Sequence, residues 1–221
     1  MTTRVLIVDD HPLVQRGLRL TLEAELDLEV AGVAGSAEDA LATLDETDPD
    51  VALVDVSLPG MNGVELTRHL VARRPALRVL VVSRHEDDLY AERVVRAGAR
   101  GYLSKVEAAD RVVEAVRAVW AGRLYLRDEV KDRLLLGGPL DAGSPLSALS
   151  DRELQVYEAV GHGQTTREIA AAMALSVKTV ETYRARIKDK LGLSSAAALL
   201  RHATRWATDP SAASGRAGGP A

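Results

Sequence analysis

The first 122 residues alternate short apolar runs with segments of helical periodicity, five times in succession. The runs at 5–8, 51–54 and 79–82 are uninterrupted, which is typical of strands buried on both faces of a sheet. Five strand–helix repeats predict an α/β domain whose parallel sheet is covered by helices on both sides. We expect strands near 4–9, 29–34, 50–54, 78–82 and 100–103, and helices near 11–25, 37–46, 63–73, 87–97 and 107–121.

Polar residues with reactive side chains follow the predicted strands. Asp9 and Asp10 come after the apolar run of the first strand, and Asp55 follows the third strand. Ser83 follows the fourth strand, and Lys105 lies just past the fifth. The carboxyl ends of parallel strands meet at one edge of a sheet, which is the edge where ligands bind in open α/β folds. We therefore expect the five side chains to converge.

The three carboxylates predict a Mg²⁺ site, since a hard cation takes oxygen ligands and keeps several waters. Asp10 and Asp55 are the predicted direct ligands, and Asp9 is predicted to act through water. A backbone carbonyl near Ser57 would complete the set. Neighbouring carboxylates repel one another, and a divalent cation relieves that repulsion. Asp10 is also a candidate N-cap for the helix that follows it.

The same cluster suits phosphoryl chemistry. A carboxylate such as Asp55 can act as a nucleophile toward phosphorus and form an acyl phosphate. Mg²⁺ and Lys105 would balance the charge of the phosphoryl group, and Ser83 would donate a hydrogen bond to one of its oxygens.

Composition divides the rest of the chain. Residues 123–147 contain Gly137-Gly138-Pro139, which predicts a linker with a short helix near 134–136. Residues 148–208 form a second predicted domain, and 209–221 are mostly Ser, Ala, Gly and Pro, which predicts a disordered tail. Residues 1–122 carry 14 Lys and Arg against 21 Asp and Glu, whereas 148–208 carry 9 against 6. An acidic half and a basic half indicate different partners, and the basic half favours contact with nucleic acid.

The second predicted domain is helical. Ser150 with Glu153, and Thr165 with Glu168, fit the capping box that opens a helix. Ser176 and Ser194 are further predicted N-caps. Four helices follow, near 151–161, 166–173, 177–191 and 195–206, and the short link between the second and third predicts a helix-turn-helix.

The third of these helices is predicted to enter the major groove of DNA. Val180, Ile187 and Leu191 form its apolar side, and Lys178 and Thr182 lie on the opposite side. Contacts with bases or phosphates are predicted for Lys178, Thr179, Thr182 and Arg186, and contacts with phosphates for Arg184, Lys188, Lys190 and Arg167. Glu181 is predicted chiefly to form an ion pair with Lys178 or Arg184.

Residues 1–122 resemble the receiver domain of bacterial two-component response regulators. The resemblance rests on Val8-Asp9-Asp10-His11, on the segment 55–63, on Ser83 and on Gly101-Tyr102-Leu103-Ser104-Lys105. It implies a flavodoxin-like fold with strand order 2-1-3-4-5 and phosphorylation of Asp55 by a sensor histidine kinase. It further implies that Asp9 and Asp10 form the Mg²⁺ pocket, and that Ser83, Tyr102 and Lys105 act as switch residues, with Tyr102 rotating inward as Ser83 approaches the phosphoryl group.

Residues 146–207 resemble the LuxR-type DNA-binding domain, with four helices. The two resemblances together imply a transcription factor of the NarL/FixJ class, which binds double-stranded DNA as a homodimer on an inverted-repeat site. Dimer contacts would then come from the helix near 195–206.

Other functions fit less well. A haloacid dehalogenase-like hydrolase needs a second aspartate where Ser57 stands, and a dinucleotide-binding enzyme needs more glycines than Gly32 and Gly35 provide. The remaining alternative is a DNA-binding regulator that uses a receiver-like domain for dimerisation without being phosphorylated. We expect a regulator and not an enzyme. The chain has no cysteine, signal-like segment or long apolar stretch, so we expect a cytoplasmic protein without a membrane partner.

Overall fold

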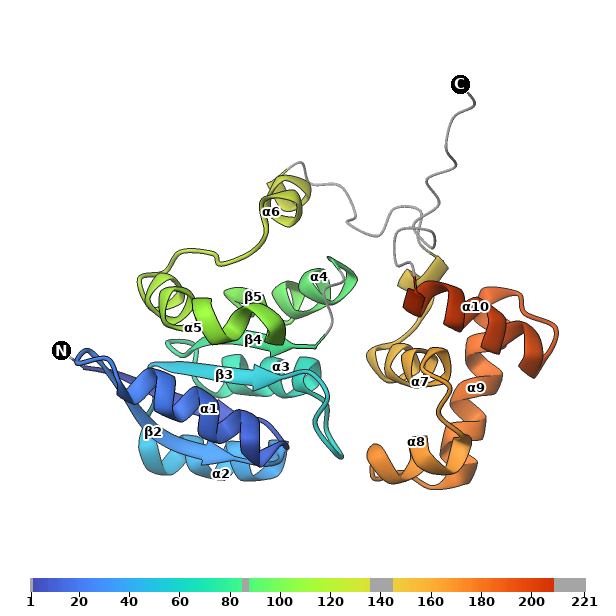
Figure 1. Ribbon diagram of the computed structural model, residues 1–221, viewed down its shortest axis with the longest axis horizontal. Helices are drawn as coiled ribbons and strands as arrows, with labels where there is room; N and C mark the ends of the chain where they lie inside the picture. Colours follow the sequence, from blue (N-terminus) through green and yellow to red (C-terminus); the bar gives the residue numbers. More distant parts are fainter. Residues whose placement is uncertain (1, 85–87, 136–144, 209–221) are drawn as a thin grey trace. The chain divides into compact units, whose positions relative to one another are not determined.

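The computed structural model describes residues 2–84, 88–135 and 145–208 (Figure 1). The chain divides into two compact units, Met1–Leu140 and Asp141–Ala221. The predicted tail, 209–221, and the glycine-rich centre of the predicted linker lie outside the described residues. Within the described ranges, none of the helices combines the length and the apolar character that a membrane span requires.

The first unit is built on a five-stranded parallel sheet in the order β2-β1-β3-β4-β5, which confirms the predicted topology. Each expected strand is present within one or two residues of its predicted ends. Most strand side chains are buried, because helices cover both faces of the sheet. The strands are β1 Thr3–Val8, β2 Leu28–Ala34, β3 Val51–Asp55, β4 Arg78–Ser83 and β5 Gly101–Ser104.

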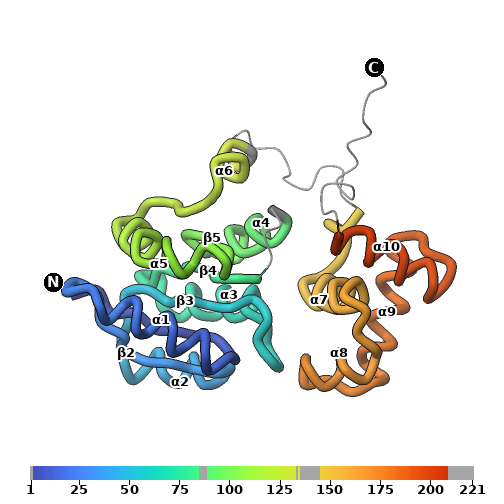
Figure 2. Tube along the Cα trace, in the orientation of Figure 1, coloured from blue at the N-terminus to red at the C-terminus, as the bar shows by residue number. Residues whose placement is uncertain are grey.

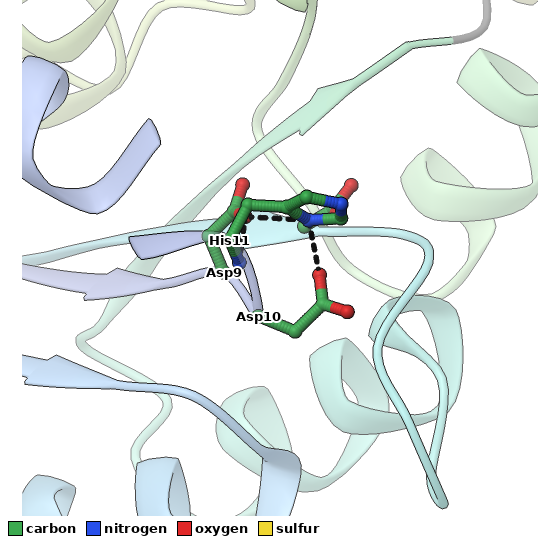
Figure 3. A group of neighbouring side chains, drawn as sticks. Asp9, Asp10 and His11 are labelled. Carbon is green, nitrogen blue, oxygen red and sulfur yellow. Dashed lines mark hydrogen bonds and ion pairs between the residues drawn. The ribbon is translucent and has the colours of Figure 1, made fainter. Parts of the chain in front are cut away.

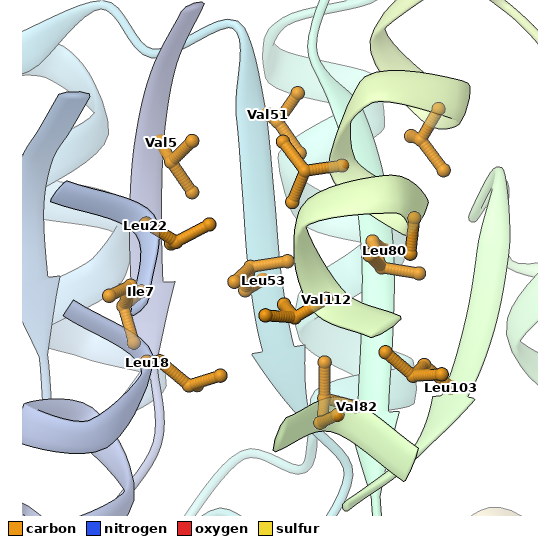
Figure 4. Packing of buried hydrophobic residues seen from close by; sticks show 14 of the residues in the cluster. Val5, Ile7, Leu18, Leu22, Val51, Leu53, Leu80, Val82, Leu103 and Val112 are labelled. Atoms are coloured by element: carbon orange, nitrogen blue, oxygen red, sulfur yellow. The ribbon is translucent and has the colours of Figure 1, made fainter. Parts of the chain in front are cut away.

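Five helices flank the sheet (Figure 1). Two of them, α1 and α5, share one hydrophobic core with the central strands (Figure 4). Leu22 of α1 and Val112 of α5 are fully buried there against Ile7 and Leu53. The other three contact the strands from which they follow or toward which they lead. The helices are α1 Pro12–Glu23, α2 Ala37–Thr47, α3 Gly63–Arg73, α4 Asp88–Arg96 and α5 Lys105–Trp120.

Local capping sets where α5 begins. The Ser104 side chain accepts a hydrogen bond from the backbone N–H of Val106 and so satisfies one of the orphan donors of the first turn. Helix α5 therefore begins at Lys105, two residues before the predicted start at 107, and Lys105 is held at the carboxyl edge of the sheet.

The loop after β3 requires a glycine at 63. The backbone N–H of Gly63 donates to the carbonyl of Val56, and a Cβ on Gly63 would lie 1.9 Å from the carbonyl oxygen of Asp55. Asn62 caps α3 by accepting from the N–H of Glu65. This packed turn fixes the backbone of Asp55 at the end of β3.

The chain after α5 stays attached to the first unit through residue 135. Tyr125 forms a parallel bridge with Gly101 at the outer edge of β5, and helix α6 Asp128–Leu135 follows. Leu126 and Val130 are buried. The first half of the predicted linker is thus an ordered extension of this unit, with a longer helix than the expected one near 134–136.

The second unit is helical, as predicted (Figure 2). Its core includes Leu154, Tyr157, Val180, Ile187 and Leu199, all with no exposed surface. It contains a short 3₁₀ turn, η1 Pro145–Ala148, and the helices α7 Asp151–Gly161, α8 Thr166–Ala172, α9 Val177–Leu191 and α10 Ala196–Thr208.

Both predicted capping boxes are present, at Ser150 and at Thr165. Ser176 caps α9 by accepting from the N–H of Thr179. The predicted cap at Ser194 is wrong by one residue: the Ser195 hydroxyl oxygen accepts from the N–H of Ala198, because α10 begins at Ala196. Gly192 ends α9 with a φ of 64°, the left-handed conformation that glycine favours.

Replacing Gly63 with Ala should destabilise the first unit by at least about 2 kcal/mol, because the new methyl group collides with backbone and not with a flexible side chain. Gly17→Ala is the matched control, since no heavy atom lies within 4 Å of its Cβ position and α1 should gain up to about 1 kcal/mol. Urea unfolding of both variants tests this. Equal midpoints for Gly63→Ala and the parent protein would contradict the packing argument.

Candidate functional site

The predicted acidic cluster is assembled at the carboxyl edge of the sheet. Ligand atoms of Asp9, Asp10, Asp55 and His11 all lie within 4.8 Å of one another. Asp9 and Asp55 are only 2% exposed, whereas 30% of the Asp10 side chain is exposed. The parallel pairing of β1 with β3 brings the two buried carboxylates together across 46 residues of sequence.

Lys105 neutralises the buried pair. Its Nζ lies 2.5 Å from Asp9 Oδ2 and 3.0 Å from Asp55 Oδ2, and only 12% of its side chain is exposed. The structure therefore brings the lysine to the carboxylates as predicted from its place after the fifth strand. At this depth the ammonium group is the main charge that opposes carboxylate repulsion.

Both oxygens of the Asp55 carboxylate are buried. The Lys105 ammonium lies 3.0 Å from Oδ2, and a hydrogen bond from the Ser57 backbone also favours the charged form. Burial raises the pKa of Asp55, the nearby Asp9 carboxylate raises it further, and Lys105 opposes both effects. Three carboxylates gathered at one place fit a hard cation such as Mg²⁺, which binds through oxygen.

His11 is a neighbour of this cluster that the sequence reasoning left without a role. Its Nδ1 lies 2.6 Å from Asp10 Oδ1 and 3.4 Å from Asp9 Oδ1 (Figure 3). Its backbone N–H donates to Asp9 Oδ1, and it occupies the N-cap position of α1 that was predicted for Asp10. The sequence feature that could have placed His11 in the cluster is its position directly after Asp9 and Asp10. One nitrogen of the His11 ring thus contacts the carboxylates of both Asp9 and Asp10.

Ser83 and Tyr102 lie on neighbouring strands. Asp55 pairs with Val82, so Ser83 is one residue beyond the aspartate's own partner on β4. Val81 pairs with Tyr102, and since side chains alternate along a strand, Ser83 and Tyr102 face the same side of the sheet. Ser83 is fully buried and Tyr102 is 8% exposed. Ser57 follows β3 in the same loop as Asn62 and is partly exposed.

Helix α9 has the buried apolar side and the exposed, mostly polar side that were predicted for it. Val180 and Ile187 are buried. The opposite side is exposed, and the side chains there are Lys178, Glu181, Thr182, Ala185, Arg186 and Asp189. Helix α8 packs on α9, and a tight turn links them with Ala174 at a φ of 54°. An exposed polar stripe on the second helix of such a pair is the arrangement that places side chains against base edges.

Four predicted DNA residues have partners inside their own unit, and one of them is Thr182, whose hydroxyl donates to the carbonyl of Lys178. Lys190 Nζ lies 2.6 Å from Glu153 Oε2, an oxygen that also accepts from the N–H of Ser150. Arg184 donates to the Thr166 hydroxyl oxygen at 3.1 Å. The Thr179 hydroxyl lies 2.7 Å from that of Ser176, at the start of α9. Arg167 is exposed on α8, and Lys188 is partly buried. Lys190 and Arg184 thus hold the orientation of α9.

Two family models match the chain. Residues 5–117 match the response regulator receiver domain, and residues 147–203 match the bacterial regulatory proteins of the luxR family. Response regulator GacA of Pseudomonas aeruginosa is 39% identical over 194 residues, which is 87% of this chain and 91% of GacA. Response regulator UvrY of Escherichia coli is 37% identical over 191 residues, 86% of this chain and 88% of UvrY.

A solved structure has the same two-part architecture. RcsB from Salmonella enterica serovar Typhimurium, bound to promoter P1flhDC in the presence of the phosphomimetic BeF3⁻, is 25% identical. The similarity covers 93% of this chain and 100% of that one, with a TM-score of 0.64.

Lys190→Met should destabilise the second unit by on the order of 1–2 kcal/mol at neutral pH, because it leaves the buried Glu153 carboxylate without its cation. Burial alone would raise the pKa of Glu153, but hydrogen bonds from Lys190 and Ser150 outweigh it and lower that pKa. The stabilisation that the charged Glu153 contributes to folding is thus complete above its unfolded-state pKa of about 4.3, and it is lost as the pH falls through the lower pKa of Glu153 in the folded state.

Thermal unfolding of Lys190→Met and the parent protein at pH 7 and below pH 4 measures this. Lys188→Met, two residues away on the same helix, is the control and should cost less than about 0.5 kcal/mol. A destabilisation by Lys190→Met that is the same at both pH values would contradict the ion-pair argument.

Proposed function

Because the chain belongs to the NarL/FixJ class of two-component response regulators, which join a receiver domain to a LuxR-type DNA-binding domain, we propose that Asp55 accepts the phosphoryl group from a histidine kinase. Membership confirms the family resemblance and makes the protein a DNA-binding transcriptional regulator. We assign residues 1–122 to the receiver, 123–147 to the linker, 148–208 to the DNA-binding domain and 209–221 to the tail, with the first part of the linker packed on the receiver.

The observation that carries the assignment is the Asp55 carboxylate itself. It ends β3, both of its oxygens are buried, and Oδ2 lies 3.0 Å from the Lys105 ammonium, which opposes the cost of burying the charge. An oxygen of Asp55 attacks the phosphorus of a phosphohistidine. The new O–P bond forms as the N–P bond to the kinase histidine breaks, and that imidazole leaves with the bonding electron pair.

We assign the Mg²⁺ site to the same cluster. Asp10 and Asp55 would bind the ion directly, Asp9 through water, and the backbone carbonyl of Ser57 would complete the protein ligands. When bound, the ion supplies positive charge that offsets the oxygens of the phosphoryl group. The partly exposed Asp10 side chain leaves the site open to solvent, so an ion can enter without unfolding of the domain.

Lys105 and Ser83 would then contact the phosphoryl group. Lys105 already lies within 3.0 Å of Asp55, so its ammonium can move from carboxylate to phosphoryl oxygen with little rearrangement. Ser83 would donate its hydroxyl to another oxygen. Its approach leaves space on the shared face of β4 and β5, into which Tyr102 would rotate.

The second unit would bind double-stranded DNA through α9 as part of a homodimer. Two α9 helices related by a two-fold axis require an inverted-repeat site with half-sites about one helical turn apart. Exposed α10 residues, including Leu200, are available for dimer contacts. A partner on the chromosome would place the protein in the cytoplasm.

Asp55→Asn should abolish phosphoryl uptake and leave the fold intact, because the amide is not a nucleophile. Asp110→Asn, an exposed aspartate on α5, is the control and should be phosphorylated normally. Intact mass after incubation with acetyl phosphate and Mg²⁺ gives the result. Undiminished uptake by Asp55→Asn would rule out the assignment. Absence of uptake by the parent protein would favour the alternative, a regulator that binds DNA without phosphorylation.

Lys178→Ala and Thr182→Ala should each cost on the order of 1–3 kcal/mol at the specific site and relax sequence preference, if each reads a base. The Thr182 hydroxyl donates to the carbonyl of Lys178, which leaves its methyl group for a thymine methyl. Lys188→Ala should instead weaken binding to all sequences and reduce the salt dependence. Gel-shift competition with a selected site and a scrambled one separates these effects. Unchanged preference in both of the first two variants would mean that α9 is not the reading helix.

A further inference from the structure

The face of the receiver formed by α4, β5 and α5 is covered by the chain's own residues 123–135, which we call the strap. The backbone N–H of Tyr125 donates to the carbonyl of Arg100 at 3.0 Å, and the N–H of Tyr102 donates to the carbonyl of Tyr125 at 2.9 Å. These two bonds extend the sheet beyond its edge strand. They also tie the strap to the backbone of the proposed switch residue.

Side chains hold the strap in the same place. Leu126 is 7% exposed and Val130 is 1% exposed, and α6 contacts α4. The guanidinium of Arg111 on α5 lies 5.5 Å from the centre of the Tyr125 ring, in a cation–π contact. Gly101 permits the close approach, because a Cβ there would lie 3.0 Å from the carbonyl oxygen of Tyr125.

Tyr102 lies directly beneath the strap. It lines a cavity of about 120 Å³ together with Ala91 of α4 and with Leu126 and Val130 of the strap. Ser104, Glu107 and the exposed Arg127 complete the lining, so the cavity is not sealed from solvent. Tyr102, Leu126 and Val130 form its apolar part, and displacement of the tyrosine ring takes apolar surface away from the two strap residues.

We propose that the strap is the element through which Tyr102 transmits phosphorylation toward the DNA-binding domain. The inference rests on the proposed function of Asp55, Ser83 and Tyr102. Inward rotation of Tyr102 removes the ring that faces Leu126 and Val130. Loss of this contact exposes apolar surface of Leu126 and Val130 to water, which costs free energy in proportion to the exposed area, so the docked strap becomes less stable and is released.

The coupling is reciprocal. If phosphorylation loosens the strap, then loosening the strap by mutation favours the phosphorylated conformation by the same factor. The strap stands between the two domains in the sequence, so its release lengthens the tether between them. It also uncovers the edge of β5.

Hydrogen exchange of the full-length protein, with and without Mg²⁺ and BeF3⁻ as the phosphoryl probe, tests the proposal. Amides of residues 123–135 should exchange at least about 10-fold faster with the probe bound. Leu126→Ala should raise their exchange without the probe, and should lower the probe concentration needed for half-saturation several-fold. Leu124→Ala is the matched control, since Leu124 is 41% exposed, and it should change neither value.

Unchanged exchange of the strap, in protein whose phosphorylation by acetyl phosphate is verified by intact mass, would overturn this proposal and leave the proposed function standing. Failure of Asp55 to be phosphorylated would instead remove the proposed function. The strap is then tested by Tyr102→Ala, which opens the same space without a phosphoryl group. Faster exchange of 123–135 in that variant would support the contact between Tyr102 and the strap, and unchanged exchange would refute it.

Discussion

The receiver domain depends on the balance of charge around the buried carboxylate of Asp55. Asp9 and Asp55 lie side by side with almost no exposure, and the ammonium of Lys105 lies within 3.0 Å of both. An isolated carboxylate at this depth would be neutralised by proton uptake, since desolvation disfavours the charged form. The Lys105 ammonium opposes this effect, because it lowers the pKa of Asp55 relative to burial alone.

Each neighbouring element serves that balance. The Ser104 cap starts α5 so that Lys105 stands at the sheet edge, and Gly63 allows the loop after β3 to close against Asp55. The hydrophobic core beneath the site includes Leu53 of β3 and Val112 of α5, and it fixes the position of α5 against β3. The buried Asp55 is thus supported by paired strands and by the packed turn at Gly63.

The DNA-binding unit uses the same kind of support. The buried Glu153 joins the start of α7 to Lys190 near the end of α9, and Arg184 joins α9 to α8. Lys190 and Arg184, which their positions in the sequence predict to be DNA contacts, therefore also hold the exposed stripe of α9 in place. Within the described part of the chain, Lys178 and Arg186 of that stripe make no such bond to another helix, and the Thr182 hydroxyl bonds within α9.

The sequence by itself determined the strand and helix order, the sheet topology, most helix caps and the identity of the acidic cluster. Each of these follows from local signals: apolar runs, capping residues and polar residues at strand ends. Only the tertiary structure decided that His11 contacts both Asp9 and Asp10, that Lys190 pairs with Glu153, and that residues 123–135 pack over Tyr102. These contacts join residues by side-chain geometry or across long sequence separations, and periodicity carries no information about such pairs. The strap shows this most clearly, because a single bridge at Tyr125 and two buried side chains turn a segment with linker composition into part of the receiver.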